Sequence, residues 1–169
     1  MEPQNPHADD GDRELPPRNG QAQLFVLRTL WIALMFSEFL YVVVSYMVAS
    51  QQEQTSSAVE MGMLEPMLAL IALGSLGASV LLPRKLLAQA MGSEDPEAIS
   101  IDVLLSRSFG PWITRMAMTE SVAVLGVAMA LISKQPHKVI PFVAISTLAL
   151  VTAYPSERSL RLFAQGSRK

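Results

Sequence analysis

Four long apolar runs constrain the fold of this chain more than any other feature of its sequence. Crossing the hydrocarbon core of a bilayer takes about 20 helical residues, with roughly 17 to 25 observed. The runs cover residues 29–49, 66–82, 112–133 and 139–154. In lipid, every backbone amide must find its hydrogen-bond partner within its own segment, so continuous runs of this length predict helices rather than strands.

The composition supports the same class of protein. Of the 169 residues, 50% are hydrophobic and 17% are charged, whereas a soluble domain usually carries about 25% charged residues. The net charge of −2 argues against nucleic acid as a partner. The chain has no cysteine, which excludes disulfides, iron–sulfur clusters and thiol catalysis. The sequence therefore predicts a small integral membrane protein.

We expect an all-α fold, a membrane-spanning four-helix bundle formed by residues 24–155. Its helices are expected at about 24–49, 62–90, 112–133 and 137–154. The second and fourth helices are extended beyond their apolar runs, because the runs alone are short for a full crossing. Residues 1–23 are acidic and proline-rich, which predicts a disordered cytoplasmic arm. Residues 156–169 are expected to form a basic cytoplasmic tail.

The segment between the second and third helices has two features of its own. Apolar and polar residues alternate over residues 99–105, which predicts a short helix at the membrane surface. The Gly110-Pro111 pair predicts a sharp break just before residue 112. We therefore expect the third membrane helix to begin as a separate element.

The basic residues predict the orientation of the bundle. If both termini are cytoplasmic, all but two of the 13 lysines and arginines lie on the cytoplasmic side, as the positive-inside rule favours. The exceptions are Lys134 and Lys138, in the loop before the fourth helix. Residues 1–23 lack the pattern of an export signal. We therefore expect a multi-pass protein of a bacterial-type inner (cytoplasmic) membrane, with the lipid bilayer as its partner.

Two glutamates lie inside the apolar runs, Glu38 in the first and Glu120 in the third. A charged side chain at the bilayer centre costs about 2.5–3.5 kcal/mol on insertion scales. At a rise of about 1.5 Å per residue, Glu38 lies ~14 Å beyond Thr29 and Glu120 ~12 Å beyond Trp112. Two carboxyl groups at like depth can face each other across a bundle. Because desolvation disfavours the ionised form, we expect at least one of them to be neutral at pH 7.

Polar residues accompany both glutamates. Tyr41 and Ser45 share a helix face with Glu38, and Thr119 directly precedes Glu120. These five residues form the candidate site. Glu120 and Glu38 are its ion-binding residues if the site binds an ion, and Tyr41, Ser45 and Thr119 support them.

Small residues predict how the helices pack. Helices in lipid can approach each other closely where small residues recur on one face. The residues that we assign to packing are Gly74, Gly77 and Ala78 in the second helix and Ala123 and Gly126 in the third. We expect these two helices to pack tightly against each other, with Glu120 near their contact.

The sequence offers no recognisable enzyme chemistry. It has no phosphate-binding glycine loop, nucleophile elbow or HExxH motif. The two histidines, His7 and His137, lie far apart, so we expect no metal site and no cofactor. Hydroxyl side chains within the runs, such as those of Ser37, Thr119 and Ser146, are expected to bond back to their own helices.

Two stretches of the sequence echo each other. Residues 31–38 and 112–120 both begin Trp-Ile-x-x-Met and end on a hydroxyl residue followed by a glutamate. The second stretch is one residue longer than the first. A duplicated pair of helices inserted in the same orientation would produce this pattern.

Residues 117–131 resemble the carboxylate-bearing helix of the ring-forming c subunit of rotary ATP synthases. Both place a glutamate before small and aliphatic residues, here Glu120 with Gly126 six positions on. The resemblance implies that Glu120 is a proton or sodium site. The connecting segment 83–111 is longer than that family's hairpin loop. As a whole, the chain resembles small, uncharacterised four-helix proteins of bacterial membranes.

Two functions remain open. The first is a non-catalytic helix-packing or assembly role, in which the buried glutamates hydrogen-bond neighbouring helices. The second is a proton- or cation-binding membrane subunit with Glu120 as the ion site, because intramembrane acids are often functional. Either function is compatible with a homo-oligomer or a membrane complex, and neither involves nucleic acid.

Overall fold

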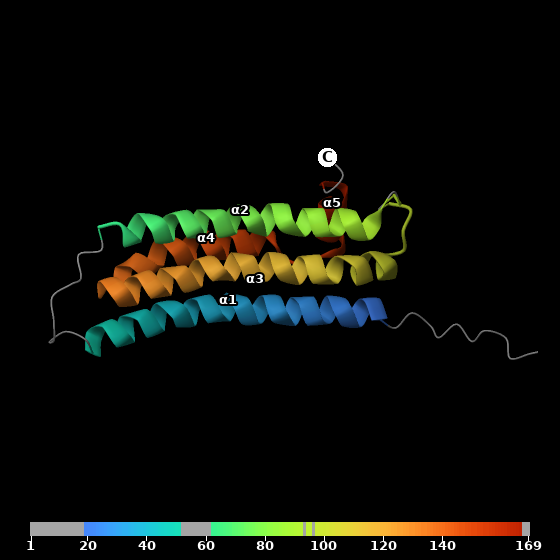
Figure 1. Cartoon of the computed structure of the whole chain (residues 1–169). Helices are drawn as coiled ribbons and strands as arrows, with labels where there is room; N and C mark the ends of the chain where they lie inside the picture. The colour runs from blue at the N-terminus through green and yellow to red at the C-terminus, as the bar shows by residue number, and fades with distance from the viewer. Residues whose placement is uncertain (1–18, 52–61, 93, 96, 167–169) are drawn as a thin grey trace, which may run out of the picture.

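The computed structural model describes residues 19–51, 62–92, 94–95 and 97–166 (Figure 1). This part of the chain is helical and contains no strand, which confirms the all-α prediction. The elements are α1 (Asn19–Gln51), α2 (Leu64–Met91), α3 (Ile101–Ser133), the short 3-10 helix η1 (Pro136–Lys138), α4 (Val139–Thr152) and α5 (Glu157–Gly166). Most of the predicted arm of residues 1–23 lies outside the described residues.

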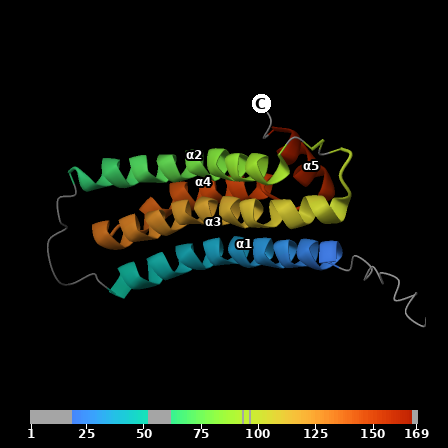
Figure 2. The same ribbon diagram turned by 45° about the vertical axis from the view of Figure 1, so that its right-hand side comes forward.

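Helix α3 lies at the centre of the structure, with α1 and α2 on either side of it (Figures 1 and 2). Helix α4 packs against both α3 and α1. Helices α1 and α3 run in one direction, and α2 and α4 run in the other. We call the end where α1 and α3 begin the basic end. It carries Arg28, Arg84, Lys85 and Arg107.

In the described part of the chain, three helices are long and apolar enough to cross a membrane: α1, α2 and α3. A fourth crossing is reached if η1 and α4 are counted together with α5, although the two parts are bent by 97° to each other. The helix predicted at 137–154 ends earlier than expected, because α4 stops at Thr152 after 14 residues. That length corresponds to about 21 Å. The chain therefore has three membrane-spanning candidates, or up to four.

The outer surface of these helices is strongly apolar. The exposed fractions of large side chains reach 70% at Phe25, 61% at Phe36, 63% at Phe39, 67% at Leu70 and 68% at Leu148. A water-soluble monomer rarely exposes an apolar surface of this extent. Together with the length of the helices, this surface indicates a membrane protein.

The break predicted at Gly110-Pro111 is wrong, because α3 continues through both residues. A proline disfavours the helical conformation of the preceding residue partly through a clash with that residue's Cβ. Gly110 has no Cβ, so this part of the clash is absent. Pro111 and Trp112 are buried, and their packing supports the helix on both sides of the proline. The surface helix predicted at residues 99–105 is therefore the beginning of α3.

The apolar core lies at the basic end. Its buried side chains come from all five helices and include Leu27, Leu87, Leu104, Trp112, Met116, Leu150, Leu160 and Phe163. Helix α5 closes this end, because it packs on α3 and α2. Its Phe163 ring lies 5.2 Å from the Trp112 ring, edge to face. The segment predicted as a basic tail is thus largely a helix with an inward apolar face.

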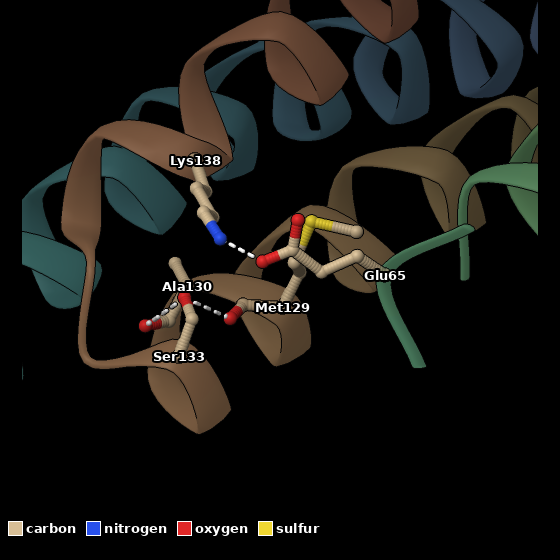
Figure 3. A network of polar contacts seen from close by, with 5 residues as sticks. All are labelled: Glu65, Met129, Ala130, Ser133 and Lys138. Carbon is tan, nitrogen blue, oxygen red and sulfur yellow. Dashed lines mark hydrogen bonds and ion pairs between the residues drawn. The ribbon is translucent and has the colours of Figure 1, made fainter. Parts of the chain in front are cut away.

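An ion pair joins two helices at the opposite end of the structure (Figure 3). The ammonium group of Lys138, in η1, contacts the carboxylate of Glu65 in the first turn of α2. In the same region, the hydroxyl of Ser133 donates to the carbonyl of Met129 at 2.7 Å, at the end of α3. Lys138 is one of the two exceptions to the positive-inside rule. Its ion pair with Glu65 leaves this exception in place, because the rule counts lysines and arginines and acidic residues contribute little.

The small residues of α2 and α3 face different surroundings. Gly74 and Gly77 are exposed, and a Cβ atom added at either one would meet no atom within 4 Å. At Gly126, an added Cβ would lie 2.5 Å from the Cβ of Phe142 in α4. The expectation that the glycines of α2 pack on α3 is therefore wrong. Gly126 instead allows α3 to approach α4.

The inward face of α2 explains this difference. Its buried residues are Ala72, Ser79, Pro83, Leu87 and Met91. At about 100° per residue, Gly74 and Gly77 lie roughly 140–200° around the helix from Ala72. Ala78 is half-buried on that outer side, whereas Ala123 of α3 is fully buried.

We expect Gly126→Ala to destabilise the protein by about 1–3 kcal/mol, because the new methyl group would overlap Phe142 and force the helices apart. The matched variant Gly77→Ala should leave stability unchanged or raise it slightly, because the site is open and alanine favours a helix. Thermal unfolding in detergent, followed by circular dichroism, compares the two. Equal effects of the two variants would contradict the observed contact of α3 with α4.

Candidate functional site

Glu120 hydrogen-bonds to α1. Its Oε1 atom accepts from the hydroxyl of Tyr41 at 2.7 Å and lies 2.8 Å from the hydroxyl of Ser37. Ser37 and Tyr41 are four residues apart, so both hydroxyl groups lie on the same face of α1. Glu120 was expected near the contact of the second and third helices, and the structure places it at the contact of α3 with α1 instead.

Tyr41 is the firmer of the two links to Glu120. The hydroxyl of Ser37 lies 2.7 Å from the carbonyl oxygen of Leu34 in its own helix, as well as near Glu120. A hydroxyl has one proton, so Ser37 donates to one of these acceptors at a time. The tyrosine hydroxyl has Glu120 as its acceptor.

Glu38 faces the other neighbour of α1. Its side chain is 1% exposed, and its Oε2 atom accepts a hydrogen bond from the hydroxyl of Thr147 in α4. Its Oε1 atom is buried and has no hydrogen-bond partner among the described residues. A buried polar atom without a partner costs about 1–3 kcal/mol. Among the described residues of the candidate site, this oxygen and the hydroxyl of Ser45 are the buried polar atoms without a partner.

The two glutamates lie at the same level of the structure. Glu120 bonds to residues 37 and 41, which precede and follow Glu38 in α1. The two carboxyl groups are close enough to interact electrostatically. No hydrogen bond joins them within the described residues, because Glu120 turns toward α1 and Glu38 toward α4. Together they link α1 to both of its neighbours.

In addition to the contacts of the two glutamates, a polar contact joins α3 to α4. The hydroxyl of Ser146, which is fully buried, donates to the backbone carbonyl of Thr119 at 2.9 Å. The hydroxyl of Thr119 donates to the carbonyl of Arg115 in its own helix, also at 2.9 Å. The expectation that such hydroxyls bond back to their own helices is therefore correct for Thr119 and wrong for Ser146.

Ser45 lies apart from these contacts. It is fully buried, and its hydroxyl has no hydrogen-bond partner among the described residues. It shares the Glu38 face of α1, since seven residues separate the two. The structure thus brings Glu38, Glu120, Tyr41 and Thr119 to one level, while Ser45 lies two turns further along α1.

Sequence reasoning missed three residues of the site as interhelical partners. Ser37, Ser146 and Thr147 reach other helices. Ser146 and Thr147 are adjacent polar residues in the middle of an otherwise apolar run. Their position in the middle of the run could have indicated an interhelical contact, because Ser and Thr side chains within membrane spans commonly hydrogen-bond to neighbouring helices.

The end of α4 is held by donors from α1 and α3. The indole N–H of Trp31 donates to the carbonyl of Leu150 at 2.7 Å, and that of Trp112 donates to the carbonyl of Ala153 at 3.1 Å. The Nε atom of Arg28 donates to the carbonyl of Pro155 at 3.3 Å. The last carbonyls of a helix lack partners within that helix. These donors supply partners at the point where the chain turns from α4 into α5.

The site offers carboxyl, hydroxyl and backbone carbonyl oxygens, which can hold a proton or join helices. The described residues contain no group of three or more His, Cys, Asp or Glu side chains that could hold a metal ion. Comparisons of the chain with protein-family models, with curated proteins and with solved structures found no match.

Replacing Tyr41 by Phe removes the hydroxyl that bonds to Glu120 and keeps the ring. We expect a loss of stability of about 0.6–1.7 kcal/mol, the range found for interhelical hydrogen bonds in membranes. The control is Tyr46→Phe, because Tyr46 is on the same helix and is 44% exposed. Unfolding by denaturant in mixed micelles measures both variants, and a similar loss in each would contradict the link between Tyr41 and Glu120.

Proposed function

We propose that this chain is a small, non-catalytic, multi-pass membrane protein with a helix-packing or assembly role. In this proposal, Glu38 and Glu120 link α1 to the rest of the helices. The observation that carries it is the pair of α1 hydroxyl groups within 2.8 Å of one oxygen of Glu120. The bond from Thr147 to Glu38 gives α1 a second link, to α4.

The small buried surface of α1 supports this role. In the most apolar 18-residue stretch of α1, 11% of the residues are buried, compared with 44% in the corresponding stretch of α3. Between helices in lipid there is no hydrophobic driving force, so packing and hydrogen bonds decide whether they associate. With so little buried surface, α1 depends on its polar links for a large share of its attachment.

The proposal includes a bacterial-type inner membrane with both termini in the cytoplasm. The basic end, where Arg28, Arg84, Lys85 and Arg107 gather, supports this orientation through the positive-inside rule. Association with a second copy or within a membrane complex is also part of the proposal. The exposed small residues of α2 support it, because such a face lets another helix approach closely. Native mass spectrometry from mild detergent measures the assembly state.

A second candidate function is a proton- or cation-binding subunit with Glu120 as the ion site. The observation that favours it is the unpartnered Oε1 atom of Glu38, next to a second carboxyl group at the same level. The resemblance of residues 117–131 to the c subunit points to Glu120.

Two variants of Glu120 separate these functions. Glu120→Gln keeps an oxygen that can accept from Tyr41 and removes the titrating group. Glu120→Leu removes both. For the assembly role, we expect Glu120→Gln to retain stability and assembly state, while Glu120→Leu loses about 1–3 kcal/mol because the half-buried hydroxyl of Tyr41 loses its acceptor. Equal stability of Glu120→Leu and the unmodified protein would contradict the assembly role.

The proton-binding role makes a different prediction for the unmodified protein. Infrared difference spectra between about pH 5 and pH 9 should show a carboxyl band that is absent from Glu120→Gln, because an ion site must exchange its proton. A carbodiimide that labels protonated carboxyl groups in membranes should label Glu120. A spectrum without that band, together with no labelling, would contradict this role.

A further inference from the structure

Arg115 is held in a fixed position near the basic end. Its guanidinium group lies 5.4 Å from the centre of the Trp112 ring and 5.6 Å from that of Phe163. Its Nη2 atom donates to the hydroxyl of Thr152 at 3.2 Å. A guanidinium carries five N–H donors, and this is the hydrogen bond that Arg115 makes among the described residues. Most of its donors are therefore available to an anion.

Arg84 of α2 lies at the same end of α5 as Arg115, since Arg84 is beside Gly166 and Arg115 is beside Phe163, three residues earlier. Gly166 is at the end of α5, and a Cβ atom added to it would lie 3.9 Å from Nη2 of Arg84. The positive charges of the two arginines repel each other. Neither arginine forms an ion pair with a carboxylate among the described residues. The pair is thus a concentration of positive charge without a protein counter-ion in the described structure.

Both arginines lie about one hydrocarbon-core thickness from the opposite end of the helices. Counted along the helices at about 1.5 Å per residue, Arg115 lies ~27 Å before the end of α3 at Ser133, and Arg84 lies ~30 Å beyond the start of α2 at Leu64. The hydrocarbon core of a bilayer is about 30 Å thick. Since α2 begins and α3 ends at the opposite end, the two guanidinium groups lie at the other surface of the bilayer.

An apolar groove lies between α2, α3 and α4, on the side of the arginines toward the opposite end of the helices. It has a volume of about 240 Å³ and is lined by residues of α2, α3 and α4, among them Leu73, Leu76, Val122, Phe142 and Ile145. Val122 follows Arg115 by seven residues and Leu73 precedes Arg84 by eleven, so each shares a helix face with its arginine. At about 1.5 Å per residue, Val122 and Leu73 lie ~10–16 Å from their arginines. An acyl chain that starts at one surface reaches about 15 Å, half of the ~30 Å hydrocarbon core, and so extends to the groove.

We propose that Arg84 and Arg115 bind the phosphate group of an anionic phospholipid, with one of its acyl chains in the apolar groove. Planar guanidinium groups match the geometry of phosphate oxygens, and an anion between the two arginines removes their repulsion. Basic pockets between membrane helices are typical sites for anionic headgroups. The groove selects a lipid over a soluble anion, because its walls are apolar. This site depends on the membrane placement of the chain and not on the role of Glu38 or Glu120.

Native mass spectrometry of the full chain in mild detergent tests the site. Phosphatidylglycerol and phosphatidylcholine with the same acyl chains are added separately, and bound lipid is measured. We expect phosphatidylglycerol to be retained more strongly, and Arg84→Gln and Arg115→Gln each to weaken its binding about fivefold. The matched control is Arg107→Gln, which makes the same charge change at the basic end in a residue that is paired with Glu94. It should bind the lipid as the unmodified protein does.

Two further experiments distinguish the contribution of the groove from that of the positive charge, and binding of a lipid from binding of a free anion. Leu73→Trp fills the groove without a change of charge, and the exposed position of Leu73 keeps the fold. It should weaken phosphatidylglycerol binding. Excess inorganic phosphate should not displace the lipid. Equal retention of the two lipids, an equal loss in Arg107→Gln, no loss in Leu73→Trp, or displacement by phosphate would each overturn the proposal.

Discussion

The arrangement of this protein depends on the satisfaction of polar atoms in a region where water is absent. A carboxyl group in lipid is tolerated when neighbouring helices supply its partners. Glu120 receives hydroxyl groups from α1, and Glu38 receives one from α4. The carboxyl groups that are costly to insert thus form hydrogen bonds with neighbouring helices. In this structure, α1 is the helix that these bonds attach.

Two regions of the molecule are stabilised in different ways. At the basic end, α5 covers Trp112 and other large apolar side chains, so this region has a core like that of a soluble protein. Further along, the outer faces of α1 and α2 are exposed and apolar, and they match lipid. The hydrogen bonds from Trp31 and Trp112 to the end of α4 belong to the first region, because Trp112, Leu150 and Ala153 are part of its core.

The sequence predicted the class of fold and the approximate positions of α1, α2, α4 and the apolar part of α3, because length and apolar content decide both. It missed α5 and the start of α3 at Ile101. It did not predict which side of a helix faces inward. In a helix of a soluble protein, the polar residues mark the side that faces water. In a membrane helix both sides are apolar, so the order of polar and apolar residues says little about which side faces inward. The glycines of α2 therefore lie outward against expectation, and Gly126 faces α4. The level shared by Glu38 and Glu120 follows from simple counting, whereas their partners on α1 and α4 do not.

The echo between residues 31–38 and 112–120 explains why the two glutamates have different partners. Seven residues separate Trp31 from Glu38, so at about 100° per residue both lie on one face of α1, and both bond to α4. In α3, eight residues separate Trp112 from Glu120. The additional residue turns Glu120 about 100° further around its helix than Glu38 lies around α1. The residue seven after Trp112 is Thr119, and its carbonyl is the one that bonds to α4. The additional residue thus keeps one face of α3 on α4 and directs the carboxyl group toward α1. A spacing of eight residues in place of seven is thus enough to bring the two glutamates to different helix contacts.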